Sequence, residues 1–275
     1  MERILYATDF SENSERALPH AWQIAMAHDA ELVMLHVMEI PTLWQHPDKA
    51  EPLEMEKDVV KDAERRLKAM FKRHADHGKV TFVLVEGISV TKTILSETKA
   101  RCAELVIVGT RGESRLKESL MGSTTMTLIR KCPVPVLAVP EGSTSKTFKK
   151  VLYASDFNKE DPEAIERLAA LSAPLGSKIS IVHIAVPGEQ ETELSKDELF
   201  DLIKKRLPDT QFDLEVRLSQ DLPGTLDEFV RMGGFDMLAL LEKERVSLLD
   251  RLFHRDLVKR MEFHARLPIL CFNAR

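Results

Sequence analysis

The chain has 275 residues, of which 44% are hydrophobic and 30% are charged, and its formal net charge at pH 7 is -5. This composition is typical of a folded globular protein and excludes a predominantly disordered chain. The negative net charge argues against a general nucleic-acid binder, because such proteins need a basic surface to neutralise phosphates.

Neither a membrane span nor a secretion signal is indicated by the sequence. No stretch approaches the roughly 20 consecutive apolar residues that a transmembrane helix requires. The N-terminal sequence MERILYATDF lacks the basic flank, apolar run and small-residue cleavage site of a signal peptide. The three cysteines are far apart and not in CxxC spacing, which favours neither disulfides nor a zinc site. We therefore expect a cytoplasmic protein.

Short apolar segments alternate with longer amphipathic segments in the first half of the chain. The strand-like segments are rich in Val, Ile and Leu and cover residues 3–8, 31–37, 79–85, 104–109 and 135–139. The helix-like segments have apolar residues three and four apart and lie near residues 13–28, 52–76, 88–101 and 120–131. This alternation predicts parallel strands joined by right-handed crossovers, with helices on both faces of the sheet.

The second half of the chain repeats the first. RILYATDFSENSERAL at residues 3–18 matches KVLYASDFNKEDPEAI at residues 150–165, and Asp161 is expected to cap a helix that has Pro162 at its first position. The strands of the second copy are expected near residues 150–155, 178–184, 212–218, 236–241 and 268–272. We therefore predict two tandem doubly wound α/β domains, residues 1–143 and 148–275, each a parallel five-stranded sheet flanked by helices.

Glycines cluster after the fourth strand of the first copy, in VGTRGESRLKESLMGST. Gly109 and Gly112 follow the strand directly, and Gly122 precedes a Ser-Thr pair at the start of a predicted helix. Neither GxxxxGK[ST] nor a helix-opening GxGxxG occurs, which removes the main support for a P-loop or a dinucleotide-binding fold. Backbone N–H groups at glycines and at a helix start can nevertheless bind phosphate. Taken singly, each glycine also fits an ordinary turn or helix entry.

The complete pattern resembles the nucleotide-binding signature of the universal stress protein family: a strand, Gly-x2-Gly, nine residues, then Gly-Ser-Thr. Other family features are Ala-Thr-Asp-Phe-Ser at residues 7–11, His36-Val37, Glu-Gly at residues 86–87 and Pro-Val-Leu-x-Val at residues 135–139. The resemblance covers the whole chain as two copies. It implies a universal stress protein-like, adenine nucleotide alpha hydrolase-like fold, with ATP and a divalent ion such as Mg²⁺ bound by the first copy.

The resemblance assigns ten residues to the nucleotide site. Those that follow the first strand would hold adenosine, and the one that ends the second strand would contact the base or ribose. Those of the glycine region would lie near the ribose and cradle the phosphates. They are Ala7, Thr8, Asp9, Val37, Val108, Gly109, Gly112, Gly122, Ser123 and Thr124. Many family members have proline where this chain has Ala7. Asp9 also fits a structural role, because an aspartate before Ser11 often caps a turn or helix. Arg111 and Arg115 either screen phosphate charge or are solvated loop cations.

The second copy lacks the glycine cradle. With a one-residue ambiguity, the residues aligned with the three glycines are Leu241 or Glu242, Glu244 or Arg245, and His254 or Arg255. Without glycine, and with glutamates nearby, this copy is not expected to bind ATP. Its replacement segment, residues 244–266, combines an apolar stripe with cations. We interpret it as an amphipathic helix, with an anion site or a membrane surface as the less favoured interpretations.

No catalytic triad or metal-ligand group can be identified, so neither catalytic residues nor protein metal ligands are assigned. The favoured hypothesis is a regulatory sensor in the stress response, in which bound adenine nucleotide changes contacts within the chain or with an unidentified protein partner. The alternatives are a slow ATPase or autophosphorylating phosphotransferase, and an interaction protein without a ligand. Because family domains commonly dimerise through their last strands, residues 135–139 and 268–272 are expected to form an intrachain pseudo-dimer. A homodimer of the whole chain is a further expectation.

Overall fold

The computed structural model describes residues 1–39, 53–74, 78–111, 121–143, 147–188, 192–243 and 266–274. The first half contains β1 (Arg3–Ala7), α1 (Glu12–Ala27), β2 (Glu31–Glu39), α2 (Leu53–His74), β3 (Val80–Gly87), α3 (Val90–Ala100), β4 (Leu105–Gly109), α4 (Ser123–Lys131) and β5 (Val136–Val139). The second half contains β6 (Lys150–Ala154), α5 (Asp161–Ser172), η2 (Ala173–Leu175), β7 (Lys178–Ala185), α6 (Lys196–Arg206), β8 (Phe212–Leu218), α7 (Leu222–Gly233), β9 (Met237–Glu242) and β10 (Ile269–Asn273). The predicted strands, and the predicted helices that fall within the described residues, are present with small shifts at their ends, whereas the amphipathic helix expected within residues 244–266 lies outside the described residues except for Arg266.

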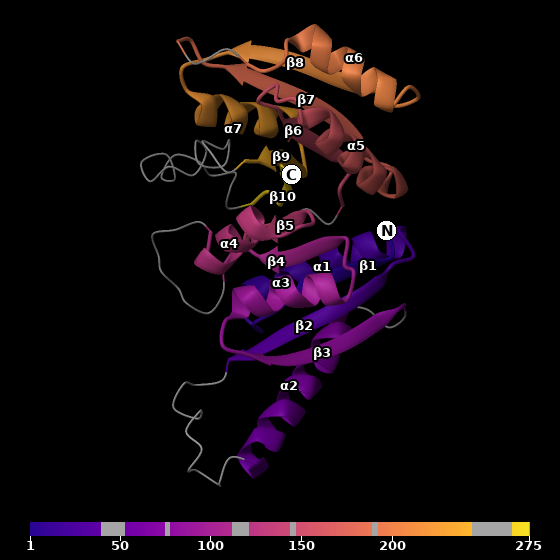
Figure 1. The fold of residues 1–275 in the computed structure, drawn as a ribbon, viewed down its shortest axis with the longest axis vertical. Helices are drawn as coiled ribbons and strands as arrows, with labels where there is room; N and C mark the ends of the chain where they lie inside the picture. The colour runs from indigo at the N-terminus through magenta and orange to yellow at the C-terminus, as the bar shows by residue number, and fades with distance from the viewer. Residues whose placement is uncertain are drawn as a thin grey trace.

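One sheet runs through both halves of the molecule (Figure 1). Its ten strands lie in the order β3-β2-β1-β4-β5-β10-β9-β6-β7-β8. Neighbouring strands are parallel except β5 and β10, which pair antiparallel with Ile269 opposite Ala138. Each half has the same internal strand order, so the two predicted five-stranded sheets are joined into one. The pairing of the last strands that the sequence predicted is confirmed by this contact.

Helices cover both faces of the sheet, as predicted. α1, α2, α5 and α6 pack on one face, and α3, α4 and α7 pack on the other. β1 shows the cause, because Ile4 and Tyr6 face the first layer while Leu5 and Ala7 face the second. Burial on both faces explains why the strands are apolar throughout rather than alternating apolar and polar residues.

The start of α5 differs from the prediction by one residue. Asp161 is the first helical residue instead of the cap, which is Glu160, and Pro162 is therefore the second helical residue. The Asp161 carboxylate points inward, where it accepts hydrogen bonds from the hydroxyls of Tyr153 at 2.7 Å and Ser155 at 2.5 Å. Burial raises the pKa of this carboxyl group. The prediction was wrong because a buried partner, and not the helix end, determines where the side chain lies.

α1 carries a buried histidine beside the connection between the two halves. His20 is 4% exposed, its Nε2 lies 3.2 Å from the Ser143 hydroxyl, and its ring centroid lies 5.3 Å from that of Phe148. The Nδ1 atom has no hydrogen-bond partner among the described residues. Burial without a charged partner lowers the pKa of His20 to about 4.

We predict that this histidine makes the protein sensitive to mild acid. The unfolded chain binds a proton at His20 below about pH 6.5, whereas the folded chain does so only near the lowered pKa. The unfolding free energy is therefore not reduced by His20 above the pKa of the unfolded chain, and it decreases as the pH falls from there toward the lowered pKa of the folded chain. Between about pH 7 and about pH 5, wild type should lose about 2 kcal/mol more unfolding free energy than His20→Gln. Urea unfolding at both pH values measures this; parallel losses in the two proteins would contradict it.

Candidate functional site

A cleft of about 560 Å³ opens at the carboxyl ends of β1, β2 and β4, beside the start of α4. Its volume is in the range of small-molecule sites, and it lies between β1 and β4, where the strand order reverses. The structure brings nine of the ten assigned residues together in its lining: Ala7, Thr8, Asp9, Val37, Val108, Gly109, Gly122, Ser123 and Thr124. Gly112, the tenth, lies outside the described residues, and so does Arg115.

Further residues line the cleft, and the sequence had drawn attention only to Arg111 among them. They are Ser14, Leu35, Glu39, Val90, Ile94, Arg111 and Thr125. Leu35 could have been found from strand alternation, because it lies two residues before Val37 on the same face of β2. Val90 and Ile94 belong to α3, and only the packing of α3 on the sheet brings them to the cleft.

The loop after β1 is held by side chains that bind its own backbone. The Thr8 hydroxyl oxygen accepts a hydrogen bond from the Phe10 N–H at 3.0 Å and lies 2.9 Å from the Ser14 hydroxyl. Asp9 Oδ1 accepts from the Ser11 N–H at 3.0 Å, and Ser11 in turn caps α1. Asp9 therefore has the turn-capping role that its sequence context suggested, and it also lines the cleft.

Aromatic contacts stabilise a strained residue in the same loop. Phe10 has a positive φ of 62°, which is unfavourable for a bulky side chain. Its ring centroid lies 4.2 Å from that of His36, and the Arg66 guanidinium carbon lies 4.2 Å from the Phe10 centroid. His36 Nδ1 donates to the Thr8 carbonyl oxygen at 2.8 Å. These contacts fix the conformation of the loop that carries Thr8 and Asp9.

The second half repeats this loop, but its described residues leave only a small space at the equivalent place. Phe157 has a φ of 53°, its N–H donates to the Ser155 hydroxyl at 3.0 Å, and its ring stacks on His183 with centroids 4.1 Å apart. The space beside residues 154–156 is only about 10 Å³. The repeated residues therefore build the loop in both halves. Because the loop is the same, residues outside it must account for the larger cleft in the first half.

Strand pairing settles the residue that replaces Gly109. Gly109 lies opposite Val139 in β5, and Leu241 lies opposite Phe272, the equivalent residue of β10. Leu241 is therefore the counterpart of Gly109. A Cβ atom on Gly109 would lie 3.2 Å from the backbone of Asn13 in α1. A glycine is therefore needed at position 109 because α1 packs closely against the end of β4. The missing side chain would in addition let a ligand approach the backbone.

The start of α4 lines the cleft, and its first backbone N–H groups have no partner within the helix itself. Gly122 occupies the cap position and makes no side-chain capping bond, while its own N–H donates to the Thr110 carbonyl at 2.6 Å. The Thr125 hydroxyl donates to the Gly109 carbonyl at 2.9 Å, which ties the helix start to the end of β4. An uncapped helix start with a positive dipole suits an anion bound beside Ser123 and Thr124.

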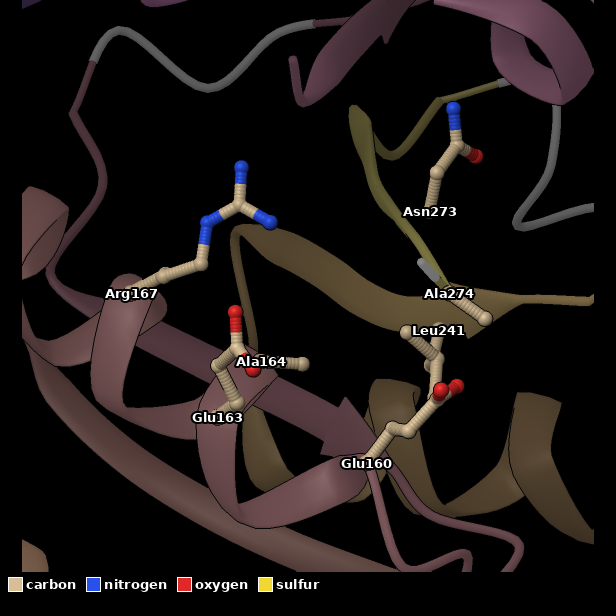
Figure 2. A pocket seen from close by; sticks show the side chains of 7 residues that line it. All are labelled: Glu160, Glu163, Ala164, Arg167, Leu241, Asn273 and Ala274. Atoms are coloured by element: carbon tan, nitrogen blue, oxygen red, sulfur yellow. The ribbon is translucent and has the colours of Figure 1, made fainter. Parts of the chain in front are cut away.

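A second cavity lies between α5 and the ends of β9 and β10 (Figure 2). Glu163 and Arg167 project from α5, Glu160 at its cap lies beside Leu241 of β9, and Asn273 comes from β10. The cavity has a volume of about 30 Å³, enough for about one or two water molecules. It is therefore too small to hold a nucleotide.

The fold and the cleft define a doubly wound α/β protein with a candidate small-molecule site at its topological switch point. The family model described as "Universal stress protein family" matches residues 1–140. The chain therefore belongs to the universal stress protein family.

Two relatives found by sequence each match half of the chain. Universal stress protein MJ0577 of Methanocaldococcus jannaschii is 29% identical over 154 residues, which are 50% of this chain and 94% of the relative. A universal stress protein of Mycolicibacterium smegmatis is 30% identical over 143 residues, which are 50% of this chain and 47% of the relative. The solved structure of a universal stress protein from Archaeoglobus fulgidus covers 98% of both chains with a TM-score of 0.70 and 16% identity, which shows a shared fold across both halves. No helix in the described part of the chain is long and apolar enough to cross a membrane.

We predict that the two glycines of the cleft respond differently to alanine. Gly109→Ala should lower the unfolding free energy by about 1–3 kcal/mol, because its Cβ would meet the backbone of α1. Gly122→Ala should cost less than about 1 kcal/mol, because its Cβ would meet nothing closer than 3.4 Å and alanine only caps a helix less well than glycine. Urea unfolding of both variants measures the difference. Equal losses would contradict the packing role of Gly109.

Proposed function

We propose that residues 1–143 form a domain that binds ATP with Mg²⁺ in this cleft, and that residues 148–275 form a second domain that does not. On this proposal the protein is a cytoplasmic nucleotide sensor of the stress response that acts through an unidentified protein partner. The observation that carries the proposal is the contrast between a cleft of about 560 Å³ in the first half and a space of about 10 Å³ at the equivalent place in the second.

The lining of the cleft has the polarity that a nucleoside polyphosphate requires. The α4 start and Arg111 lie beyond the end of β4 and provide positive charge for phosphates. Val37 and Ile94 form an apolar wall for the base, and Glu39 at the end of β2 can accept hydrogen bonds from a sugar or base. The phosphates would therefore lie against α4, and the nucleoside against β1, β2 and α3.

The metal would be held mostly by the nucleotide. Among the described residues there is no group of three or more His, Cys, Asp or Glu side chains that could hold a metal ion. Mg²⁺ commonly keeps several waters and binds substrate phosphates with only one or two protein carboxylates. Its contribution in this cleft would be to neutralise phosphate charge.

The second domain lacks the space and the glycines of the first. Leu241 stands where Gly109 stands in the first domain, and it is buried. The positions aligned with Gly112 and Gly122, and the amphipathic helix expected within residues 244–266, lie outside the described residues except for Arg266. Its role under this proposal is structural or concerns a different ligand.

Isothermal titration with ATP and Mg²⁺ tests the proposal. We expect one ATP per chain, and Gly122→Val should weaken binding at least tenfold, about 1.4 kcal/mol, by filling space that the phosphates need. Asp9→Ala should also weaken binding, and Asp156→Ala is the matched control because it changes the equivalent residue in the closed half. Two ATP per chain, or equal effects of Asp9→Ala and Asp156→Ala, would refute the assignment to the first domain.

Turnover separates the sensor from the enzyme alternative. We expect phosphate release and protein phosphorylation far below the roughly 1–1,000 s⁻¹ typical of enzymes, because no described residue is placed as a dedicated general base. Assays with ATP and Mg²⁺ measure both. Rapid turnover that is lost in Asp9→Ala and in Gly122→Val would establish the ATPase or phosphotransferase alternative. Absence of thermal stabilisation by millimolar ATP would favour the ligand-free interaction protein.

A further inference from the structure

β8 is the edge strand of the described sheet in the second half, and β3 is the edge strand in the first half (Figure 1). Its ladder with β7 determines which backbone groups the outer edge presents. The Ser219 N–H, directly after the strand, donates to the Ala185 carbonyl of β7 at 3.0 Å. Because alternate residues of a strand point to opposite edges, the N–H and C=O groups of Leu214, Val216 and Leu218 point away from β7.

The side chains of this strand are unusually exposed for an apolar edge. Leu218 is 78% exposed and Val216 is 40% exposed, on the same face as Leu214. The opposite face carries Glu215 and Arg217, whose Oε1 and Nη2 atoms lie 2.5 Å apart. The other edge strand, β3, has no large hydrophobic side chain of comparable exposure. An exposed apolar edge is a template for pairing with another strand.

We infer that β8 pairs antiparallel with β8 of a second copy of this chain, about a two-fold axis at Val216. Val216 then lies opposite Val216 of the second copy, and Leu214 lies opposite its Leu218. Each of these opposed pairs exchanges two backbone hydrogen bonds through the groups that point away from β7. On the other face, Glu215 lies opposite Arg217 of the second copy, and the symmetry repeats this ion pair.

Charge selects this register over its neighbour. Centring the axis on Glu215 also matches the backbone groups, but it places two Glu215 carboxylates directly opposite each other, which is unfavourable. The axis at Val216 instead pairs every charge of Glu215 and Arg217 with its opposite and covers the exposed apolar side chains. The interface is small, so the dimer should be weak and concentration-dependent, with a Kd of roughly micromolar or above.

Sedimentation velocity of the full chain tests the interface by exchanging charges. Glu215→Arg places arginines opposite arginines and Arg217→Glu places glutamates opposite glutamates, so each variant alone should dimerise at least tenfold more weakly than wild type. An equimolar mixture of the two variants should restore dimers, and so should the double exchange Glu215→Arg with Arg217→Glu. Glu86→Arg on β3 is the matched control and should dimerise as wild type does.

Proline provides a test that does not depend on charge. Val216→Pro removes an N–H that points to the second copy and none that pairs with β7, so it should abolish dimers while leaving the circular dichroism and the melting temperature of the monomer nearly unchanged. Three results would overturn the inference: a wild type that is monomeric up to about 1 mM, dimers that persist in both single charge variants, or a mixture of those variants that stays monomeric.

Discussion

The antiparallel pairing of β5 with β10 is the contact on which the rest of the structure depends. Each five-stranded half would otherwise end in a buried, apolar strand with one unpaired edge, and the pairing satisfies both edges at once. It also places α4 against both halves. Arg130 Nε near the end of α4 lies 3.5 Å from Glu242 Oε1, and the Asn273 amide donates to the Cys132 carbonyl. A helix whose first turn lines the cleft therefore has its last turn on the second half.

The two halves separate the residues that build the fold from those that open the cleft. The strained phenylalanine, the hydroxyl that accepts its N–H and the histidine ring against it occur in both halves, with ring centroids 4.2 Å apart in the first half and 4.1 Å apart in the second. Among the described residues, the first half has a cleft of about 560 Å³, and the space at the equivalent place in the second half is about 10 Å³. Identity between the copies therefore marks a loop needed for the fold, which also lines the cleft in the first half. The two copies differ at Gly109 and at Gly122 beside the cleft.

The sequence predicted strands, helices and most of the cleft lining because these depend on local patterns. Periodicity identifies buried strands, and parallel strands bring the residues at their carboxyl ends to one edge of the sheet. The remainder depends on tertiary contacts. The counterpart of Gly109 was ambiguous until strand pairing identified Leu241. Asp161 was misplaced because its partners, Tyr153 and Ser155, are buried. Ile94 reaches the cleft only through the packing of α3, which no spacing within that helix reveals.

Asp161 is a further difference between the two halves, next to the repeated loop. Its counterpart in the repeat is Ser14, a small neutral residue that lines the cleft and whose carbonyl accepts a hydrogen bond from the Tyr6 hydroxyl at 2.6 Å. In the second half the tyrosine hydroxyl donates instead to the buried Asp161 carboxylate. A carboxyl group held there by Ser155 is a poor neighbour for a phosphate, because any ionised fraction repels the anion. Leu241, by contrast, packs on the α5 face of the sheet, away from the small space beside residues 154–156. On the proposal of one nucleotide site per chain, the charge of Asp161 would therefore weigh against anion binding in the second half, whereas Leu241 would not block it by volume.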